Sequence, residues 1–354
     1  MSRYLFISTA ESFQTPYIET YESFFEGSYD FLFWNRSEAG CNRDRANPIP
    51  FFAKNNNKFE KLIGYLKFRH FAKKHLIENE YDGVVLLQTQ PALMLGSVLI
   101  QRFAGRFICD IRDYFFENFS IVTMLESKLF RFSYANLISS PGYKMFLPKE
   151  ADYCLLHNNH PDLFDEASPS CVVNRPIRIM FIGTIRFFDQ CRKLIMRFSK
   201  DRRFCLAFYG AGAFALKDAC ADLNLDNVEF KDVFSPDDTV ELLRSADLIF
   251  NLYGNNTPLL DYALSNKLYY AAELGKPILV CPDTYMEDVA MRYNLGFVVD
   301  LERKDASSSL YDAYSRFDFS LFDKQRIIFL ESVNKDNAIT SSLLRKFFQN
   351  GSDS

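Results

Sequence analysis

Short apolar segments that favour β-strands alternate with longer segments of helical periodicity along the whole of this 354-residue chain. This alternation is typical of a parallel sheet, because each parallel strand needs a helical crossover to bring the chain back to the same edge. The predicted strands form two sets, at 4–9, 29–34, 83–88, 106–111, 135–139 and 152–156, and at 178–183, 204–209, 228–231, 247–252, 277–281 and 296–300. The sequence therefore predicts an α/β protein.

The segment between the two sets, from His157 to Pro176, is polar, rich in turn-forming residues and without clear periodicity. A chain of this length has room for roughly two domains of typical size. We therefore predict an N-terminal domain at 1–160, a linker at 161–176, a C-terminal domain at 177–335, and a last helix and tail at 336–354. In doubly wound domains, ligands bind at the carboxyl ends of the strands.

The composition excludes several classes of protein. Hydrophobic residues make up 48% of the chain and charged residues 24%, as in a folded soluble protein. The formal net charge of −4 argues against a general nucleic-acid binder, so we expect no nucleic-acid partner. The eight cysteines have no C-x-x-C spacing, and several lie in apolar runs, which favours free thiols in a reducing cytoplasm.

The N-terminus enters a predicted strand without a signal-peptide pattern. The most apolar stretch, Gly83–Ile100, is interrupted by Gln88, Gln90 and Pro91, so we do not expect it to span a bilayer. We expect a cytoplasmic protein, either free or attached peripherally to the inner face of the cytoplasmic membrane.

The segment from Ser265 to Pro277 predicts a short helix with defined ends. Ser265 is a favourable N-cap, Gly275 suits the left-handed position after a helix, and the proline prevents continuation. The first turn carries Asn266 and Lys267 instead of carboxylates. Free N–H groups, the positive end of the helix dipole and an ammonium group therefore converge at one place, which suits an anion such as a diphosphate.

This segment and the strand before it read SADLIFNLY at 245–253 and LSNKLYYAAELGKPILV at 264–280. The pair resembles the donor-binding segment of two-domain GT-B glycosyltransferases, especially the family 4 enzymes of bacterial capsular polysaccharide and exopolysaccharide synthesis. The resemblance implies two Rossmann-like domains that face each other across a cleft, with the acceptor bound by the first and the nucleotide-sugar donor by the second. It also implies that no metal or other cofactor is required.

A glycine loop follows the first strand of the second domain. Gly183 would allow the backbone to approach a phosphate, Thr184 follows it, and Arg186 can bind a phosphate through two hydrogen bonds. A tight turn without a ligand is the alternative. Family 4 enzymes commonly have Gly-Arg here and a Lys further on, for which Arg192 and Lys193 are candidates unless they are solvated helix residues.

Three further loops of the second domain match donor-binding segments of the resembled family. They supply the candidates Gly210, Gly212, Val233, Phe234, Asn255 and Asn256. Gly210 and Gly212 form a G-x-G loop at a strand end. Val233 and Phe234 lie in a segment that resembles the one holding the nucleobase. Asn255 and Asn256 should lie beside the donor sugar or phosphates. For the asparagines, a polar surface turn is the alternative.

The chain departs from the family at two glutamates. Many retaining family 4 enzymes carry them eight positions apart, where this chain has Tyr262 and Tyr270. A tyrosine can hydrogen-bond to ribose or stack, but it supplies no carboxylate. Glu273, one helical turn beyond Tyr270, can partly substitute. Because these two carboxylates are missing, the protein could also be a catalytically silent subunit that binds nucleotide sugar.

In the first domain, residues 109–117 read CDIRDYFFE and resemble the D-x-R-D segment of the same enzymes. We expect Asp113 to accept or orient the acceptor proton and Arg112 to neutralise the diphosphate. The alternative is an Arg–Asp pair within the domain. The next predicted strand is followed by a candidate acceptor-side loop, residues 139–142.

The segment 54–75 carries seven lysines and arginines against a single Glu60. With Phe59 and Leu62 at helical spacing, it can lie on an anionic membrane; a solvated helix with a core stripe is the alternative.

His157 and His160 have a spacing that a metal can use, but no carboxylate or cysteine cluster accompanies them, so no metal site is expected.

The sequence and the resemblance together predict a glycosyltransferase that moves a sugar from a nucleotide-diphosphate donor to a glycan acceptor, which we expect to be lipid-linked, in surface polysaccharide synthesis. The resemblance alone implies a hexosyltransferase with retention of configuration. Two alternatives stay open: a catalytically silent subunit that binds nucleotide sugar, and a GT-B nucleotide-sugar epimerase, for which no convincing set of carboxylates and histidine is found.

Overall fold

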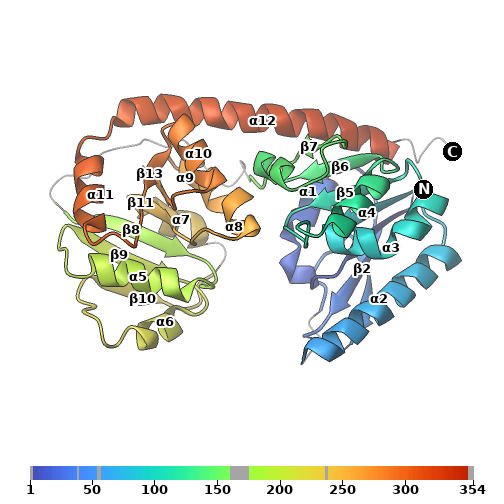
Figure 1. Ribbon diagram of the computed structural model, residues 1–354, viewed down its shortest axis with the longest axis horizontal. Helices are drawn as coiled ribbons and strands as arrows, with labels where there is room; N and C mark the ends of the chain where they lie inside the picture. Colours follow the sequence, from blue (N-terminus) through green and yellow to red (C-terminus); the bar gives the residue numbers. More distant parts are fainter. Residues whose placement is uncertain (1–2, 38–39, 54–56, 160–174, 236–237, 350–354) are drawn as a thin grey trace. The chain divides into compact units, whose positions relative to one another are not determined.

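The computed structural model describes residues 3–37, 40–53, 57–159, 175–235 and 238–349 (Figure 1). It contains two compact units: unit 1 comprises Met1–His157 and Lys335–Ser354, and unit 2 comprises Asn158–Asn334. Of the predicted linker at 161–176, only residues 175 and 176 lie within the described part of the chain.

Unit 1 is built on a parallel sheet with the strand order β3-β2-β1-β4-β5-β6-β7. The strands are β1 (Tyr4–Ser8), β2 (Tyr29–Asn35), β3 (Ala46–Phe52), β4 (Gly83–Leu87), β5 (Phe107–Ile111), β6 (Ala135–Ile138) and β7 (Cys154–Leu155). The sequence prediction missed β3. This strand carries Pro48 and Pro50 and lies at the edge of the sheet, where a missing backbone N–H is tolerated.

Helices cover both faces of this sheet. They are η1 (Ser12–Gln14), η2 (Pro16–Ile18), α1 (Glu19–Glu22), α2 (Lys58–Glu78), α3 (Thr89–Arg102), α4 (Ser120–Phe130) and η3 (Pro141–Met145). Helices α2, α3 and α4 pack side by side over one face (Figure 1). On the other face, Leu344, Phe347 and Phe348 from the end of α12 (Phe319–Gln349) join the core around Tyr4 and Phe6.

Unit 2 repeats the architecture with the strand order β10-β9-β8-β11-β12-β13, all parallel. The strands are β8 (Ile177–Ile182), β9 (Phe204–Tyr209), β10 (Val228–Lys231), β11 (Leu248–Asn251), β12 (Ile278–Val280) and β13 (Gly296–Val298). All six predicted strands of this half are confirmed.

The helices of unit 2 are α5 (Phe188–Phe198), α6 (Ala213–Ala219), α7 (Thr239–Arg244), α8 (Pro258–Tyr262), α9 (Asn266–Glu273), α10 (Tyr285–Arg292) and α11 (Ala306–Ser315), followed by the start of α12. One hydrophobic cluster lies between the sheet and α5, α6 and α11. A second lies between the sheet and α7, α9, α10 and α12. The predicted last helix at 338–349 is longer than expected, because α12 begins at Phe319.

Both sheets have the strand order of a doubly wound fold, in which the direction of winding reverses between two central strands. The reversal lies between β1 and β4 in unit 1, and between β8 and β11 in unit 2. At such a point the loops after the two strands leave a crevice between them, and ligands bind there. No described helix is both long enough and apolar enough to cross a bilayer.

Candidate functional site

Lys267 lies at the reversal point of unit 2. Helix α9 begins as predicted, with the Ser265 hydroxyl accepting a hydrogen bond from the Lys267 N–H at 3.3 Å. The Lys267 Nζ lies 4.9 Å from the centre of the Phe181 ring and 5.4 Å from that of Tyr253. It is also 3.9 Å from the point where a Cβ on Gly183 would stand. The structure thus brings together the predicted cationic helix start and the predicted glycine loop.

The two predicted glycine loops are in direct contact. Gly183 and Gly210 have φ values of 113° and 129°, which favour glycine. A Cβ on Gly210 would stand 2.2 Å from the Gly183 carbonyl oxygen, so no other residue fits without moving the backbone. Gly212, with φ of 93°, precedes α6, and its N–H donates to the Asp232 carboxylate at 3.1 Å. Glycine is therefore required here for backbone packing, which also leaves the loop surface without side chains.

The side chains of the asparagines after β11 form hydrogen bonds within their own loop and to the loop after β12. The Asn255 side chain donates to the Pro282 carbonyl at 3.0 Å, and the Asn256 side chain donates to that of Asn255 at 2.6 Å. Asn256 has a φ of 67°, and its N–H donates to Asp261. These bonds hold the loop against the end of the next strand.

The remaining donor-side candidates differ in exposure. Thr184 and Arg186 are exposed, and no ion pair joins Arg186 to another described residue. Val233 is 76% exposed, whereas Phe234 is partly buried against the core. The further basic candidates face other partners, since Arg192 forms an ion pair with Asp222 and Lys193 one with Glu302.

Glu273 lies at the opposite end of α9 from Lys267, about 9 Å along the axis for six residues. Burial raises the pKa of its carboxyl group, and the nearby Arg326 of α12 opposes this. Tyr270 is half-buried, and burial raises the pKa of its hydroxyl group. Glu273 lies one turn beyond Tyr270 on the same helix, and its part in donor binding stays a prediction.

Arg112 is a buried structural residue in unit 1. Its guanidinium donates to both carboxylate oxygens of Asp110, from Nε at 2.6 Å and from Nη2 at 3.1 Å, and to the Leu156 carbonyl at 3.3 Å. It also lies 4.6 Å from the centre of the Tyr17 ring. Burial and the Asp110 carboxylate raise the pKa of the Tyr21 hydroxyl, which donates to Asp110. Arg112 therefore forms an Arg–Asp pair within the unit, with Asp110 as its partner, and its contact with a diphosphate stays a prediction.

Asp113 lies two residues after the end of β5, and it is exposed at the carboxyl end of the sheet. The neighbouring Arg112 is held on both sides, because its carbonyl also accepts a hydrogen bond from the Tyr143 hydroxyl at 2.6 Å. The buried pair therefore fixes the backbone from which the Asp113 carboxylate projects.

Two buried carboxyl groups lie close behind this loop, Glu117 and Glu126. No N–H or hydroxyl group of a described residue donates to the oxygens of Glu126, and the group beside them is the Glu117 carboxyl. Two carboxyl groups can share a hydrogen bond only if one is protonated. Burial and the Glu117 charge raise the pKa of Glu126 to about 9, so Glu126 holds the proton near neutral pH.

Sequence analysis missed a polar cluster at the reversal point of unit 1. The buried Thr9 hydroxyl donates to the Gln90 side chain at 2.8 Å, and the Arg36 guanidinium donates to the Thr9 carbonyl at 2.7 Å. Gln88 has a φ of 87°, which is uncommon for a residue with a side chain. Its position directly after the apolar residues of β4 was the signal that could have identified it.

His157 and the candidate acceptor-side loop 139–142 form hydrogen bonds within the protein. His157 is buried, its Nε2 is 3.3 Å from the Asp336 carboxylate, and burial lowers the pKa of its ring. His160 lies outside the described residues. The Ser140 hydroxyl accepts a hydrogen bond from the Gly142 N–H at the start of η3. Among the described residues, no three His, Cys, Asp or Glu side chains are grouped to hold a metal ion.

No protein-family model and no curated protein matches the chain. Solved structures do match over almost the full length. Sucrose-phosphate synthase from Thermosynechococcus elongatus has a TM-score of 0.70 and 11% identity, and the match covers 99% of this chain and 100% of that one. A glycosyltransferase from Rickettsia africae has a TM-score of 0.66 and 15% identity, covering 99% and 97%. HepE from Anabaena, in complex with UDP, has a TM-score of 0.66 and 12% identity, covering 98% and 100%.

These likenesses are structural, since the identities are 15% or lower. They confirm the predicted fold class, the α/β fold of GT-B glycosyltransferases. The particular family and the part in capsule synthesis stay predictions.

Proposed function

We propose that this protein is a glycosyltransferase that uses a nucleotide-diphosphate sugar. The observation that carries the proposal is the position of Lys267, at the first turn of α9 and beside Gly183 at the reversal point of a doubly wound sheet. The GT-B fold and the UDP bound by the similar HepE protein support it.

In this proposal the donor diphosphate lies at the start of α9. The positive end of the helix dipole, its free N–H groups and the Lys267 ammonium attract the phosphate oxygens. Gly183 carries no side chain that would keep the phosphate away, and the exposed Arg186 can fold over it. These charges would stabilise the leaving diphosphate without a metal ion.

Unit 1 would bind the acceptor, at the carboxyl end of its sheet. Asp113 is the candidate for receiving or orienting the acceptor proton, and the buried Arg112–Asp110 pair positions it. If the reaction retains configuration, Asp113 orients groups and the leaving phosphate takes the proton. The polar cluster around Thr9 and Gln88 is a further candidate surface for sugar hydroxyl groups.

We also propose that the acceptor is a lipid-linked glycan, with the protein attached peripherally to the cytoplasmic face of a membrane for surface polysaccharide synthesis. Helix α2 supports this, because Phe59, Leu62 and Leu66 are exposed among its basic residues. The core stripe of α2 is made by Gly64, Phe68, Ala72 and Leu76. Lys54 of the predicted basic segment lies outside the described residues.

A second candidate function is a silent nucleotide-sugar-binding subunit. It is favoured by Tyr270, which stands where many retaining enzymes of the resembled family have a glutamate. A protein that lacks this carboxylate can bind the donor without catalysing sugar transfer.

Two measurements together test the proposal. A thermal-shift screen with nucleotide-diphosphate sugars should find a donor that raises the melting temperature, because it binds only the folded state. With that donor, release of the free nucleotide diphosphate should be followed over time. Binding with release supports the transferase, binding without release supports the silent subunit, and no binding of any nucleotide sugar contradicts both.

A further inference from the structure

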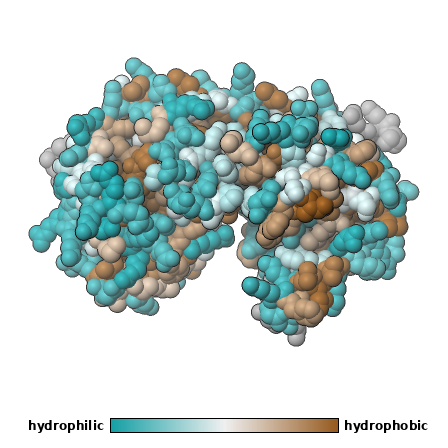
Figure 2. All heavy atoms as spheres, in the orientation of Figure 1, coloured by the Kyte–Doolittle hydropathy of each residue, from teal (hydrophilic) through white to brown (hydrophobic). Residues whose placement is uncertain are grey.

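Five apolar side chains lie exposed at the start of α4 and in the loop before it. They are Phe116, Phe119, Ile121, Met124 and Leu125, which we call the α4 platform, and they are between 46% and 58% exposed. We propose that the α4 platform seats unit 1 on an anionic lipid surface. Figure 2 shows hydrophobic side chains over α4 and, separately, near the start of α2.

The backbone is strained where the platform begins. Phe116 has a φ of 57°, in the left-handed region that a bulky side chain rarely adopts. The loop is held in this conformation by two hydrogen bonds, from the Phe115 N–H to the Glu117 carboxylate and from the Phe119 N–H to the Phe116 carbonyl. Strain of this kind persists only where the surrounding structure imposes it, and here it accompanies an exposed ring.

The ring of Phe116 lies near a second aromatic ring of the platform, Phe119, and near the adjacent Phe115. The centre of the Phe116 ring is 5.3 Å from that of Phe115 and 6.3 Å from that of Phe119. Exposed apolar groups gathered in this way mark a surface that is covered when the protein functions.

The charges around the platform identify an anionic partner. Between residues 114 and 150 the basic residues are Lys128, Arg131, Lys144 and Lys149, and all four are exposed. The acids of this stretch are Glu117 and Glu126, which are buried, and Glu150. Four exposed basic residues therefore face one exposed acid, Glu150, within this stretch, and the exposed Asp113 and Asp152 lie just outside it. Over residues 113–152 the exposed charges keep a positive excess, in a chain whose net charge is −4.

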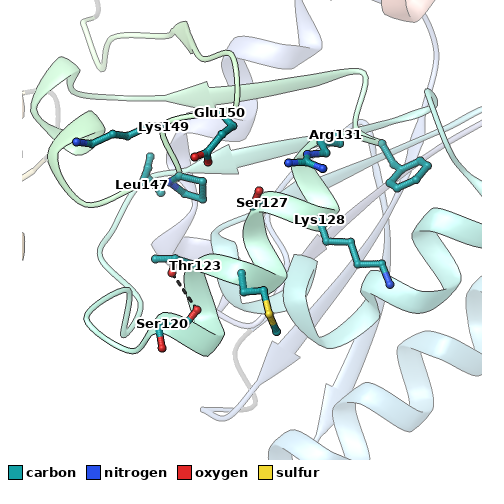
Figure 3. A pocket seen from close by; sticks show the side chains of 11 residues that line it. Ser120, Thr123, Ser127, Lys128, Arg131, Leu147, Lys149 and Glu150 are labelled. Carbon is teal, nitrogen blue, oxygen red and sulfur yellow. Dashed lines mark hydrogen bonds between the residues drawn. The ribbon is translucent and has the colours of Figure 1, made fainter.

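A cavity of about 770 Å³ adjoins the platform between α4 and the segment 147–150 (Figure 3). Met124 belongs to both the platform and the cavity wall. The charged residues that line the cavity are three cations and one acid, namely Lys128, Arg131, Lys149 and Glu150. Apolar side chains that enter the membrane interface would thus have cations beside them at the level of the lipid headgroups. That combination is typical of peripheral attachment to anionic membranes.

The platform would also place the candidate acceptor edge at the membrane. Phe116 is three residues from Asp113, and both follow β5. This consequence rests on the proposed function, since it brings Asp113 to the headgroup of a lipid-linked glycan. The attachment itself does not depend on that activity.

Fluorescence gives a direct test, because the native Trp34 is fully buried and is the single tryptophan of the chain. In a Phe119→Trp variant of the full chain, the added tryptophan should shift to shorter wavelengths with vesicles of phosphatidylcholine and phosphatidylglycerol, and not with phosphatidylcholine alone. A Met291→Trp variant, at an exposed position on α10 of unit 2, is the control and should not respond.

Sedimentation with the same vesicles measures the contribution of the platform. A Phe119→Ser/Met124→Ser variant should bind anionic vesicles about tenfold or more weakly, because it loses two apolar side chains from the interface. A Phe59→Ser/Leu66→Ser variant of α2 is compared with it. Nucleotide binding of the platform variant should be unchanged, which separates this proposal from that of the donor site.

Three outcomes would overturn the proposal. One is that wild-type protein ignores anionic vesicles. Another is that the platform variant binds them as wild type does, while the α2 variant does not. The last is that wild type ignores lipid and forms a dimer which the platform variant lacks, because the platform would then be a protein interface.

Discussion

Lys267 combines two effects in one residue, a charge and a place at a helix start. Replacing it by alanine should weaken binding of the nucleotide diphosphate by roughly 1–3 kcal/mol, because a charge-assisted hydrogen bond is lost while the helix remains. Isothermal titration calorimetry with UDP and other nucleoside diphosphates measures this change. Lys200→Ala is the matched control, since this exposed lysine lies between α5 and β9, at the opposite edge of the sheet. Equal affinity of both variants and wild type would remove Lys267 from the site.

Asp113 is expected to affect turnover and not donor binding. Asp113→Asn keeps the shape of the side chain and removes its charge, so sugar transfer should fall by roughly 10²–10⁴-fold if the carboxylate acts on the acceptor proton. Nucleotide affinity and melting temperature should stay normal. Asp152→Asn changes an exposed carboxylate before β7 and serves as the control. Transfer near the wild-type rate would refute a catalytic role.

At the scale of elements, the packing of α4 depends on the shared proton of Glu126 and Glu117. The pKa of Glu126 is raised from 4.5 to about 9 by burial and by Glu117, so the folded state holds a proton that the unfolded state releases. The free energy of unfolding should therefore decrease as the pH rises from about 4.5 towards 9, by at most about 1.4 kcal/mol per pH unit from this group.

Glu126→Gln should remove this dependence, because an amide can donate to Glu117 at every pH. Urea unfolding of both proteins between pH 5 and pH 9 measures the effect. The free energy of unfolding of the variant should exceed that of wild type by an amount that grows towards high pH. Parallel pH profiles would mean that the two carboxyl groups do not share a proton.

At the scale of the whole molecule, α12 contributes to two separate cores. Phe347 packs in unit 1 against the core that includes Tyr4, and Phe329 packs in the core of unit 2 that includes Tyr269. Phe347→Ala should destabilise unit 1 by about 3–5 kcal/mol, as for other buried phenylalanines, and leave unit 2 protected. Hydrogen exchange should then increase in β1 and β4 only.

Phe329→Ala is the matched variant on the same helix, and exchange should increase in unit 2 instead. Nucleotide binding should survive the change in unit 1 better than the change in unit 2. The same exchange pattern in both variants would show that the two cores unfold together.

Local patterns in the sequence were sufficient for much of this protein. The alternation of strands and helices predicted both parallel sheets, and Ser265, Lys267 and Gly275 defined the start and end of α9, because capping and backbone conformation depend on neighbouring residues. The edge strand β3 was missed, since its two prolines are unfavourable in most strands.

Contacts between distant residues were decided by the tertiary structure alone. The sequence places Arg112 between two aspartates, and only the fold shows that its guanidinium binds the buried Asp110. Likewise, Thr9 meets Gln90 across 81 positions because β1 and β4 are neighbours in the sheet. Local propensity acts over a few residues. Which side chains are buried, which carboxyl groups share a proton and which apolar groups stay exposed depend instead on the elements that the sheet order brings together.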